Sequence, residues 1–361
     1  MRISIDVRMM WSSGIGTYIR NLVPRILDAY PDAHFFLLGD PKKMESWKGF
    51  QKTNVHLVKA VSGIYTLSEQ LTIVSKIPGG TDLFWSPHYN FPVLRRGKLL
   101  VTVHDVFHVA MKRYVQGFHR RWYAQMMFDQ LAQKANMVIA VSKFTQSELV
   151  SWTKVDPQKV KVVYNGVDPS WFNISRLESP HPRPYLLFVG NIKPHKNLGR
   201  LLEAFEILKD QIPHDLVLVG KKEGFIIEDK EIIEKARNLK GRVHFTGEIN
   251  DQHLQQYYAF AELLVFPSLY EGFGLPPLEA MACGIPVAAS LIPSLAEICG
   301  KAVQYFDPYR PEDMAEKIQD VLQNEALRQD LIQKGLERAH QFTWDRCAEE
   351  TRKLIGETLS L

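Results

Sequence analysis

The chain has few cysteines and no long apolar segment. Its 361 residues contain three cysteines, Cys283, Cys299 and Cys347, which show neither the even number of a disulfide framework nor CxxC spacing. We therefore expect a reduced, cytoplasmic protein. No apolar run approaches the roughly 18 residues that a transmembrane helix needs. The first segment, MRISIDV, is predicted to form a strand rather than a signal peptide.

The sequence also lacks the ligand patterns of a metal site. No Asp-x-Asp follows an apolar strand, and no cluster of histidines and cysteines has ligand spacing. We therefore expect no metal and no cofactor, so that any charge that develops in a reaction is stabilised by side chains and backbone.

Charge is spread unevenly, although the formal net charge is only +4. Residues 1–170 contain 22 Lys and Arg against 12 Asp and Glu, a net of +10; the rest contains 22 against 28, a net of −6. An excess of positive charge attracts anionic partners. A lipid surface or a phosphate-bearing acceptor fits, and so does a solvated surface without a partner. Nucleic acid is disfavoured, because no recognition motif accompanies the basic residues.

Short apolar, β-branched segments alternate with helical patterns along the chain. Strands are predicted at 3–7, 35–38, 55–58, 83–86, 99–104, 137–141, 160–164, 185–189, 216–219, 243–246, 263–266, 287–289 and 303–306. Helices are predicted at 17–29, 118–134, 143–152, 198–209, 228–238, 251–259, 277–282 and 311–324, with further helix to the end of the chain. This alternation is typical of parallel sheets covered by helices on both faces. We predict an α/β protein with two Rossmann-like, doubly wound domains facing across a cleft.

The domain boundary is predicted at the segment PSWFNISRLESPHPRPY, residues 169–185. It is rich in proline and polar residues, which is typical of a linker. The first domain then spans 1–170, the linker 171–184 and the second domain 185–342. Ligands of such sheets bind beyond the carboxyl ends of the strands.

The segment YEGFGLPPLEAMACG, residues 270–284, combines two glutamates with a glycine turn before the helix predicted at 277–282. Gly272 and Gly274 let backbone N–H groups point outward, and a helix dipole adds positive charge, so the turn is a candidate phosphate site. Glu279, in the predicted first turn of that helix, can accept hydrogen bonds from vicinal hydroxyls, as on a ribose. The spacing alone fits a glutamate-capped helix after a tight turn equally well.

The pair Glu271 and Glu279 resembles the glutamate-x7-glutamate motif of retaining glycosyltransferases of family 4, which have the two-domain GT-B fold. Further segments occur in that family's order over essentially the whole chain. They are VYNGVD (163–168), FVGNIKPHKNLGRLLEAF (188–205), SLAEICGKAVQYFDP (294–308) and TWDRCAEET (343–351). The resemblance implies that residues 343–361 pack back onto the first domain. It also implies that the first domain binds the acceptor and the second the nucleotide sugar.

The resemblance assigns donor-binding roles in the second half. Glu279 resembles the residue that binds the ribose, and Glu271 the residue that holds hydroxyls of the donor sugar. Lys196 matches the lysine that neutralises the diphosphate, and a fixed cation stabilises the charge of a departing diphosphate. The backbone that meets the phosphates corresponds to Gly272, Phe273, Gly274 and Leu275.

One departure from the family pattern concerns a second cation. Many family members carry an arginine in the loop before Lys196, whereas Asn191 occupies a candidate position here. Either the second cation is missing, or Lys193 or His195 replaces it. Asn191 is kept as a donor-binding candidate.

The first half contributes two weaker signals. Gly14 and Gly16, in WSSGIGTYIRNL, precede the helix predicted at 17–29; a lone GxG is weak evidence, but in the family this loop lies over the donor phosphates. His104 and Asp105 follow the strand predicted at 99–104, although a lone histidine is often structural. The resemblance implies that His104 lies near the reacting sugar carbon and that Asp105 supports it.

The predicted function is transfer of a hexose with retention and without a metal. The segments SPHYNFP (86–92) and VTVHDVFH (101–108) resemble those of bacterial mannosyl- or rhamnosyltransferases of surface polysaccharide. The first choice of donor is GDP-mannose, and the acceptor is a saccharide or lipid-linked saccharide. Residues 112–127 mix cations with aromatics, which fits peripheral contact with the inner face of the cytoplasmic membrane or a solvated helix face. A sugar-nucleotide epimerase of the same fold and a non-catalytic sugar- or lipid-binding protein stay open as alternatives.

Overall fold

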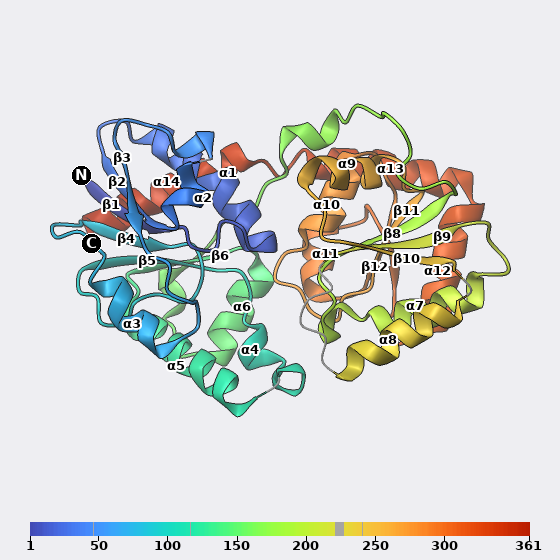
Figure 1. Cartoon of the computed structure of the whole chain (residues 1–361), viewed down its shortest axis with the longest axis horizontal. Helices are drawn as coiled ribbons and strands as arrows, with labels where there is room; N and C mark the ends of the chain where they lie inside the picture. The colour runs from blue at the N-terminus through green and yellow to red at the C-terminus, as the bar shows by residue number, and fades with distance from the viewer. Residues whose placement is uncertain (46, 116, 221–226, 240) are drawn as a thin grey trace. The chain divides into compact units, whose positions relative to one another are not determined.

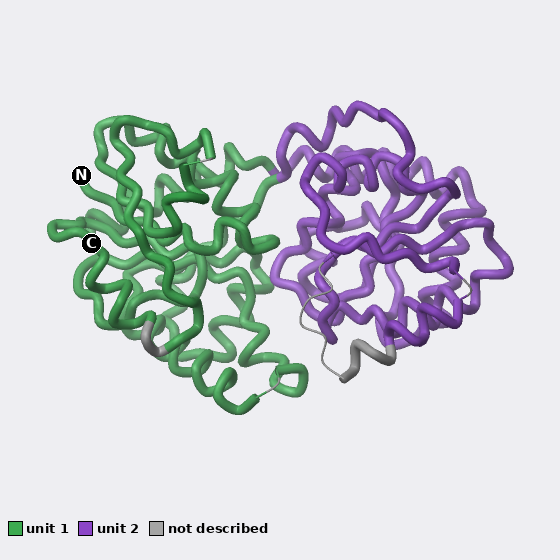
Figure 2. The backbone as a smooth tube through the Cα atoms, viewed as in Figure 1, with its two compact units in different colours: residues 1–166, 343–361 green, residues 167–342 purple. Residues whose placement is uncertain are grey.

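The computed structural model describes residues 1–45, 47–115, 117–220, 227–239 and 241–361. The chain forms two compact units, each built on one parallel sheet (Figure 2). Unit 1 contains residues 1–166 and 343–361, and unit 2 contains residues 167–342. The chain thus leaves unit 1 once and returns to it through its last helix.

The sheet of unit 1 has seven strands in the order β3-β2-β1-β4-β5-β6-β7, all parallel. The strands are β1 (Arg2–Asp6), β2 (His34–Gly39), β3 (Val55–Lys59), β4 (Leu83–Ser86), β5 (Lys98–Val103), β6 (Met137–Ala140) and β7 (Val160–Val162). The strand order reverses between β1 and β4, where Ile3 pairs with Leu83. The carboxyl edge at such a reversal is where doubly wound sheets bind ligands.

Helices cover both faces of this sheet (Figure 1). They are α1 (Ser13–Ala29), α2 (Pro41–Glu45), α3 (Leu67–Val74), α4 (Phe107–Ala110), α5 (Phe118–Lys134), α6 (Lys143–Trp152) and α14 (Trp344–Ser360). Helices α1 and α14 pack together over one face, and α5 and α6 contribute to the core on the other. Trp344, only 1% exposed, lies edge-on to Tyr18 with ring centroids 6.0 Å apart. The apolar side of the last helix is therefore part of the core of unit 1.

The sheet of unit 2 has six parallel strands in the order β10-β9-β8-β11-β12-β13, which reverses between β8 and β11. The strands are β8 (Tyr185–Val189), β9 (Asp215–Val219), β10 (Val243–Gly247), β11 (Leu263–Phe266), β12 (Val287–Ser290) and β13 (Gln304–Phe306). The helices are α7 (Leu198–Leu208), α8 (Ile227–Asn238), α9 (Asp251–Ala259), α10 (Leu275–Ala282), α11 (Pro293–Cys299), α12 (Pro311–Gln323) and α13 (Glu325–Ala339). Helices α7 and α12 pack together and close one core of the unit.

Every predicted strand is present, with ends shifted by no more than a few residues. Helix starts were predicted less well: α1 begins at Ser13 rather than 17, and α10 at Leu275 rather than 277. The short helices α2, α3, α4 and α11 were not predicted. In the part of the chain that the structure describes, no helix has both the length and the apolar character to cross a bilayer.

Candidate active site

The predicted donor-binding residues gather at the carboxyl edge of the sheet of unit 2. The 3-10 turn η5 (Pro194–Lys196) follows β8, and the glycine turn before α10 follows β11, so both loops leave the strands at which the order reverses. The backbone N–H of Leu269 donates to the carbonyl of His195 over 2.7 Å. This hydrogen bond ties the two loops together at the position where ligands bind such sheets.

Lys196 and Glu271 are in direct contact. The Nζ of Lys196 donates to Oε1 of Glu271 over 2.5 Å, and the two side chains are only 17% and 14% exposed. The ammonium also lies over the ring of Phe266, 5.5 Å from its centroid, where a cation interacts favourably with the aromatic face. Because the two charges compensate each other, an anion that binds Lys196 competes with Glu271 for it.

Few residues at the start of α10 have a backbone N–H group that is available as a hydrogen-bond donor. Gly274 is the N-cap, no side chain caps the helix, and the second and third helical positions are prolines, which carry no N–H. The N–H groups of Gly274 and Leu275 therefore form the positive end of this helix. Gly274 has φ of 100°, and a Cβ there would lie 2.6 Å from Cδ2 of Leu295. The backbone conformation therefore favours glycine, and any other residue would also have to displace the Leu295 side chain.

The residues before this cap are buried. Gly272 is buried, and Phe273 is 5% exposed, with its ring edge-on to Phe342 at a centroid distance of 5.9 Å. Phe273 therefore anchors the turn through its buried side chain. Because that side chain points into the core, a ligand at this turn would contact the backbone.

Glu279 lies in the second turn of α10, not in the first turn as predicted. The prediction was wrong because the helix begins at Leu275, so the prolines occupy its second and third positions instead of starting it. The hydroxyl of Tyr258 donates to Oε2 of Glu279 over 3.1 Å. Burial raises the pKa of Glu279 to about 7, and the charge of Asp251 adds to this, while the Tyr258 hydrogen bond acts in the opposite direction. The carboxylate is thus oriented by a buried phenol.

The candidates for a second cation lie close to Lys196. Lys193 is the N-cap of η5, and His195 lies within it. Asn191 lies just before this turn, at a tight crossing: a Cβ on Gly220 would lie 2.0 Å from the carbonyl oxygen of Gly190 and 3.3 Å from the backbone N of Asn191. Lys193 and His195, the candidates to replace the arginine of other family members, therefore lie in one short turn. Whether one of them replaces it or the second cation is missing stays open.

The two glycines of the first loop lie inside α1 rather than before it. The helix begins at Ser13, whose φ is 30°, so Gly14 and Gly16 belong to its first turn. A Cβ on Gly16 would lie 2.7 Å from the carbonyl oxygen of Met10, whereas Gly14 is exposed and has open space around it. The close approach of the backbone therefore explains Gly16 only. The predicted boundary was wrong because glycine weakens a helical pattern without excluding a helix.

His104 directly follows β5 and is held in one orientation. Its Nε2 lies 2.8 Å from the carbonyl oxygen of Pro87, and its ring lies edge-on to Tyr18 at a centroid distance of 4.8 Å. Burial lowers the pKa of His104 to about 4, against the opposing effects of the Pro87 carbonyl and Asp105. The ring is therefore neutral at pH 7. Because a carbonyl only accepts, the proton is on Nε2 and Nδ1 is an acceptor.

Asp105 acts on the backbone beside His104. Its Oδ1 accepts a hydrogen bond from the N–H of Phe107 over 2.9 Å, at the start of α4. The hydrogen bond of the His104 ring goes to Pro87, so the influence of Asp105 on the ring is electrostatic. Support of His104 by Asp105 in catalysis stays a prediction.

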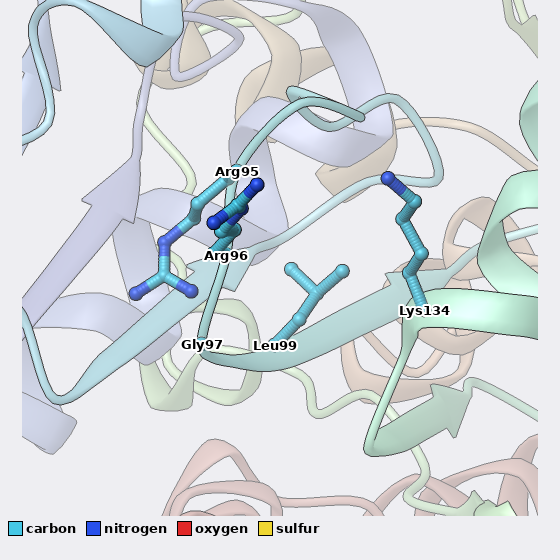
Figure 3. Close-up of a pocket in the computed structure, with 5 residues that line it drawn as sticks. All are labelled: Arg95, Arg96, Gly97, Leu99 and Lys134. Carbon is cyan, nitrogen blue, oxygen red and sulfur yellow. The ribbon is translucent and has the colours of Figure 1, made fainter.

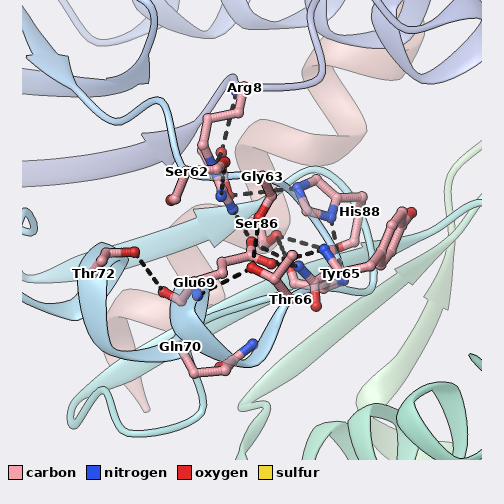
Figure 4. Close-up of polar contacts among 12 residues, drawn as sticks. Arg8, Ser62, Gly63, Tyr65, Thr66, Glu69, Gln70, Thr72, Ser86 and His88 are labelled. Atoms are coloured by element: carbon pink, nitrogen blue, oxygen red, sulfur yellow. Dashed lines mark hydrogen bonds and ion pairs between the residues drawn. The ribbon is translucent and has the colours of Figure 1, made fainter. Parts of the chain in front are cut away.

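A buried ionic network, not predicted from the sequence, lies at the strand reversal of unit 1 (Figure 4). Arg8 donates to both carboxylate oxygens of Asp6, through Nε over 2.9 Å and Nη2 over 2.6 Å, and Nη2 also pairs with Glu69. These three side chains are at most 4% exposed. Burial alone would raise the pKa of Asp6, but the Arg8 guanidinium outweighs it and holds that pKa well below its usual range. Asp6 therefore stays ionised beside Arg8.

This network holds the turn that orients His104. Asn90 donates through Nδ2 to both oxygens of Glu69, over 2.7 and 2.8 Å. The hydroxyl of Ser86 lies 2.8 Å from the carbonyl oxygens of His88 and Asn90, which closes the turn that contains Pro87. The charged pair Arg8–Glu69 thus fixes, through Asn90, the carbonyl that binds the ring of His104.

A basic pocket lies at the opposite, amino edge of β5 (Figure 3). Its volume is about 280 Å³, and it is lined by Arg95, Arg96, Gly97, Leu99 and Lys134. Burial lowers the pKa of Arg95 to about 10, and its guanidinium donates to the carbonyls of Lys98, over 2.9 Å, and Thr81, over 3.3 Å. None of the predicted site residues lines this pocket, which gathers part of the positive charge of the first half of the chain.

Two family models match the chain. One, described as glycosyl transferases group 1, matches residues 169–338, and one described as glycosyltransferase family 4 matches residues 12–171. Together they span nearly all of the chain, which belongs to the group 1, family 4 glycosyltransferases. The chain is therefore an enzyme of the hexosyltransferase class, as predicted.

Individual relatives agree with this family. O-antigen chain mannosyltransferase B of Escherichia coli is 28% identical over 282 residues, which are 74% of this chain and 72% of that protein. O-antigen chain mannosyltransferase RfbU of Salmonella typhimurium is 28% identical over 247 residues, 68% of this chain and 66% of that protein. The crystal structure of Anabaena HepE in complex with UDP and glucose covers 99% of this chain and all of its own, with a TM-score of 0.77 at 17% identity. The predicted GT-B fold of two Rossmann-like domains is confirmed.

Proposed function

We propose that this chain transfers mannose from GDP-mannose to a saccharide or lipid-linked saccharide, with retention and without a metal ion. The observation that carries the proposal is the Lys196–Glu271 pair beside the start of α10. A cation, two backbone donors and two carboxylates are together on one sheet edge, which is the set of groups that a nucleotide diphosphate sugar needs.

Each group of this set has one role in the proposal. Lys196 binds the diphosphate, and the N–H groups of Gly274 and Leu275 bind a phosphate oxygen at the positive end of α10. Glu279, oriented by Tyr258, accepts hydrogen bonds from the ribose hydroxyls. Glu271, released from Lys196 by the diphosphate, accepts hydrogen bonds from the sugar.

The proposed reaction breaks the bond between the sugar C1 and the phosphate oxygen and forms a bond from C1 to the acceptor oxygen on the same face. The acceptor's proton goes to the departing phosphate oxygen. Negative charge grows on the diphosphate, and Lys196 with the start of α10 stabilises it, as a divalent ion does in other enzymes. The ring of His104 is neutral and is held by its hydrogen bond to the carbonyl of Pro87. In the proposal, its Nδ1 accepts a hydrogen bond from a hydroxyl of the sugar.

The donor is argued from the relatives. Two of them are named mannosyltransferases, which favours mannose as the transferred sugar. UDP-glucose is the second candidate, because the structure of HepE contains UDP and glucose. Incubation of the enzyme with each donor and a membrane-lipid extract, followed by measurement of free nucleotide, distinguishes them. Release that depends on the acceptor supports a transferase, release without acceptor points to hydrolysis, and a donor that is consumed without release points to the epimerase.

Membrane contact is proposed for α5 and the segment before it. Phe118 and Trp122 are 75% and 53% exposed, and Lys112 lies 5.9 Å from the ring centroid of Trp152. Exposed aromatics beside cations favour an anionic lipid surface at the inner face of the cytoplasmic membrane. Flotation with phosphatidylglycerol vesicles, compared with phosphatidylcholine, tests this contact. Phe118→Ser with Trp122→Ser should reduce flotation, and unchanged flotation contradicts the proposal.

A further inference from the structure

Three side chains far apart in the sequence meet at the amino edge of the sheet of unit 2. His181 precedes β8, Asp215 is the first residue of β9, and His244 is the second residue of β10. The Nε2 atoms of His181 and His244 lie 2.8 and 3.2 Å from the same atom, Oδ2 of Asp215. We propose that these three side chains bind one divalent transition-metal ion, with zinc the preferred ion.

The geometry suits a tetrahedral ion. Zinc binds imidazole nitrogen and carboxylate oxygen at about 2.0–2.2 Å, so its ligand atoms lie about 3.3 Å apart. The three ligand atoms here all lie within 4.8 Å of one another, and two of the separations are 2.8 and 3.2 Å. Small side-chain movements therefore make room for an ion. Two imidazoles with one carboxylate favour zinc, cobalt or nickel over magnesium or calcium.

The two oxygens of Asp215 have different partners. Arg242 donates through Nε to Oδ1 over 2.7 Å, and Arg183 lies 3.2 Å from the same oxygen. The arginines thus fix the carboxylate and leave Oδ2 facing the two imidazoles, as outer partners of metal ligands do. Their positive charges oppose a cation, although Arg183 is 48% exposed and therefore screened by solvent. We expect micromolar rather than nanomolar affinity.

The site is separate from the donor site. It lies at the amino ends of the strands, whereas Lys196 and Glu271 follow the carboxyl ends of β8 and β11. A bound ion would join the segment that contains His181 to β9 and β10, and it would therefore raise the stability of the folded state. This inference does not depend on the proposed function, and metal-independent transfer is compatible with it.

The test is titration of the metal-stripped, full-length protein with cobalt chloride and zinc chloride. Visible absorption reports cobalt coordination, and calorimetry and thermal unfolding report zinc. The main variant is His244→Gln, because the His244 side chain is 41% exposed and its loss leaves the core intact. His181→Gln is the second variant. The matched control is His34→Gln, since His34 and His56 form another close pair, with ring nitrogens 3.5 Å apart.

The proposal predicts one ion per chain and a rise in melting temperature on adding zinc. His244→Gln and His181→Gln should raise the dissociation constant about tenfold or more, while His34→Gln should leave it unchanged. Absence of binding overturns the proposal, as does binding that His244→Gln leaves intact or that His34→Gln removes. Nucleotide binding, measured in the same samples, should be the same with and without zinc.

Discussion

The contact between Lys196 and Glu271 predicts that substitutions of these two residues change nucleotide affinity in opposite directions. Lys196→Met removes the cation that the diphosphate needs. A hydrogen bond to a charged group contributes about 1.5–3 kcal/mol, so the dissociation constant of the nucleoside diphosphate should rise about 10- to 150-fold. The side chains are only 17% and 14% exposed, so solvent screens this interaction little.

Glu271→Gln removes the group that competes for Lys196. Nucleoside diphosphate affinity should therefore be unchanged or higher, whereas sugar transfer should fall about a hundredfold or more because the sugar is no longer positioned. Calorimetric titration measures the first effect, and turnover with the sugar nucleotide measures the second.

The matched control for these variants is Lys235→Met. Lys235 pairs with Glu203 over 2.8 Å in the same unit, with side chains 38% and 43% exposed. This variant should bind nucleotide as the wild type does. Affinity of Lys196→Met within twofold of the wild type, or a loss of nucleotide binding in Glu271→Gln equal to that in Lys196→Met, would refute the reasoning.

Three further predictions concern stability and positioning. Because burial raises the pKa of Glu279 to about 7, the unfolded chain ionises there at lower pH than the folded one, and stability falls as pH rises from about 4.5 to 7. Glu279→Gln should thus stabilise the fold by about 1–2 kcal/mol at pH 8, allowing for partial exposure, and should have no effect near pH 4. Equal changes in the free energy of urea unfolding at pH 4 and pH 8 would contradict this. Trp344→Ala should cost about 3–5 kcal/mol, because it empties part of the core of unit 1; a loss below about 1 kcal/mol in thermal unfolding contradicts it. Glu69→Gln should weaken the turn that holds His104 and lower kcat about tenfold or more. The pH profile of kcat should show no new ionisation between pH 5.5 and 7.5, because burial lowers the pKa of His104 to about 4. An unchanged kcat, or a new ionisation in that range, would contradict the positioning role.

The central strands were predictable because they are short apolar segments that parallel sheets bury on both faces, and the edge strands β3, β7 and β10 keep enough β-branched residues to continue the pattern. Helix starts were less predictable because they depend on backbone conformation. At α10 the prolines occupy the second and third positions after a glycine with φ of 100°, and at α1 the helix begins at a serine with φ of 30°. The missed helices α2, α3, α4 and α11 are eight residues or shorter, too short for a clear helical period.

The arrangement of the proposed donor site was predictable where its residues are local in sequence. Glu271, Gly274 and Glu279 belong to one turn and one helix, and the resemblance added Lys196. The network of Asp6, Arg8 and Glu69 was not predictable, because it joins segments that only the sheet order brings together. The same holds for His181, Asp215 and His244, whose spacing in sequence carries no metal pattern.

The most direct test of the central claim is nucleotide binding to the proposed donor site. Thermal unfolding is measured with GDP, UDP, ADP and dTDP, each in excess EDTA, for the wild type and for Glu279→Ala. A ligand that binds only the folded state at 100 times its dissociation constant stabilises it by about 2.7 kcal/mol. The account predicts that one nucleotide raises the melting temperature of the wild type in EDTA and that Glu279→Ala loses most of this shift. A wild type that none of the four nucleotides stabilises would contradict the assignment of this sheet edge as the donor site.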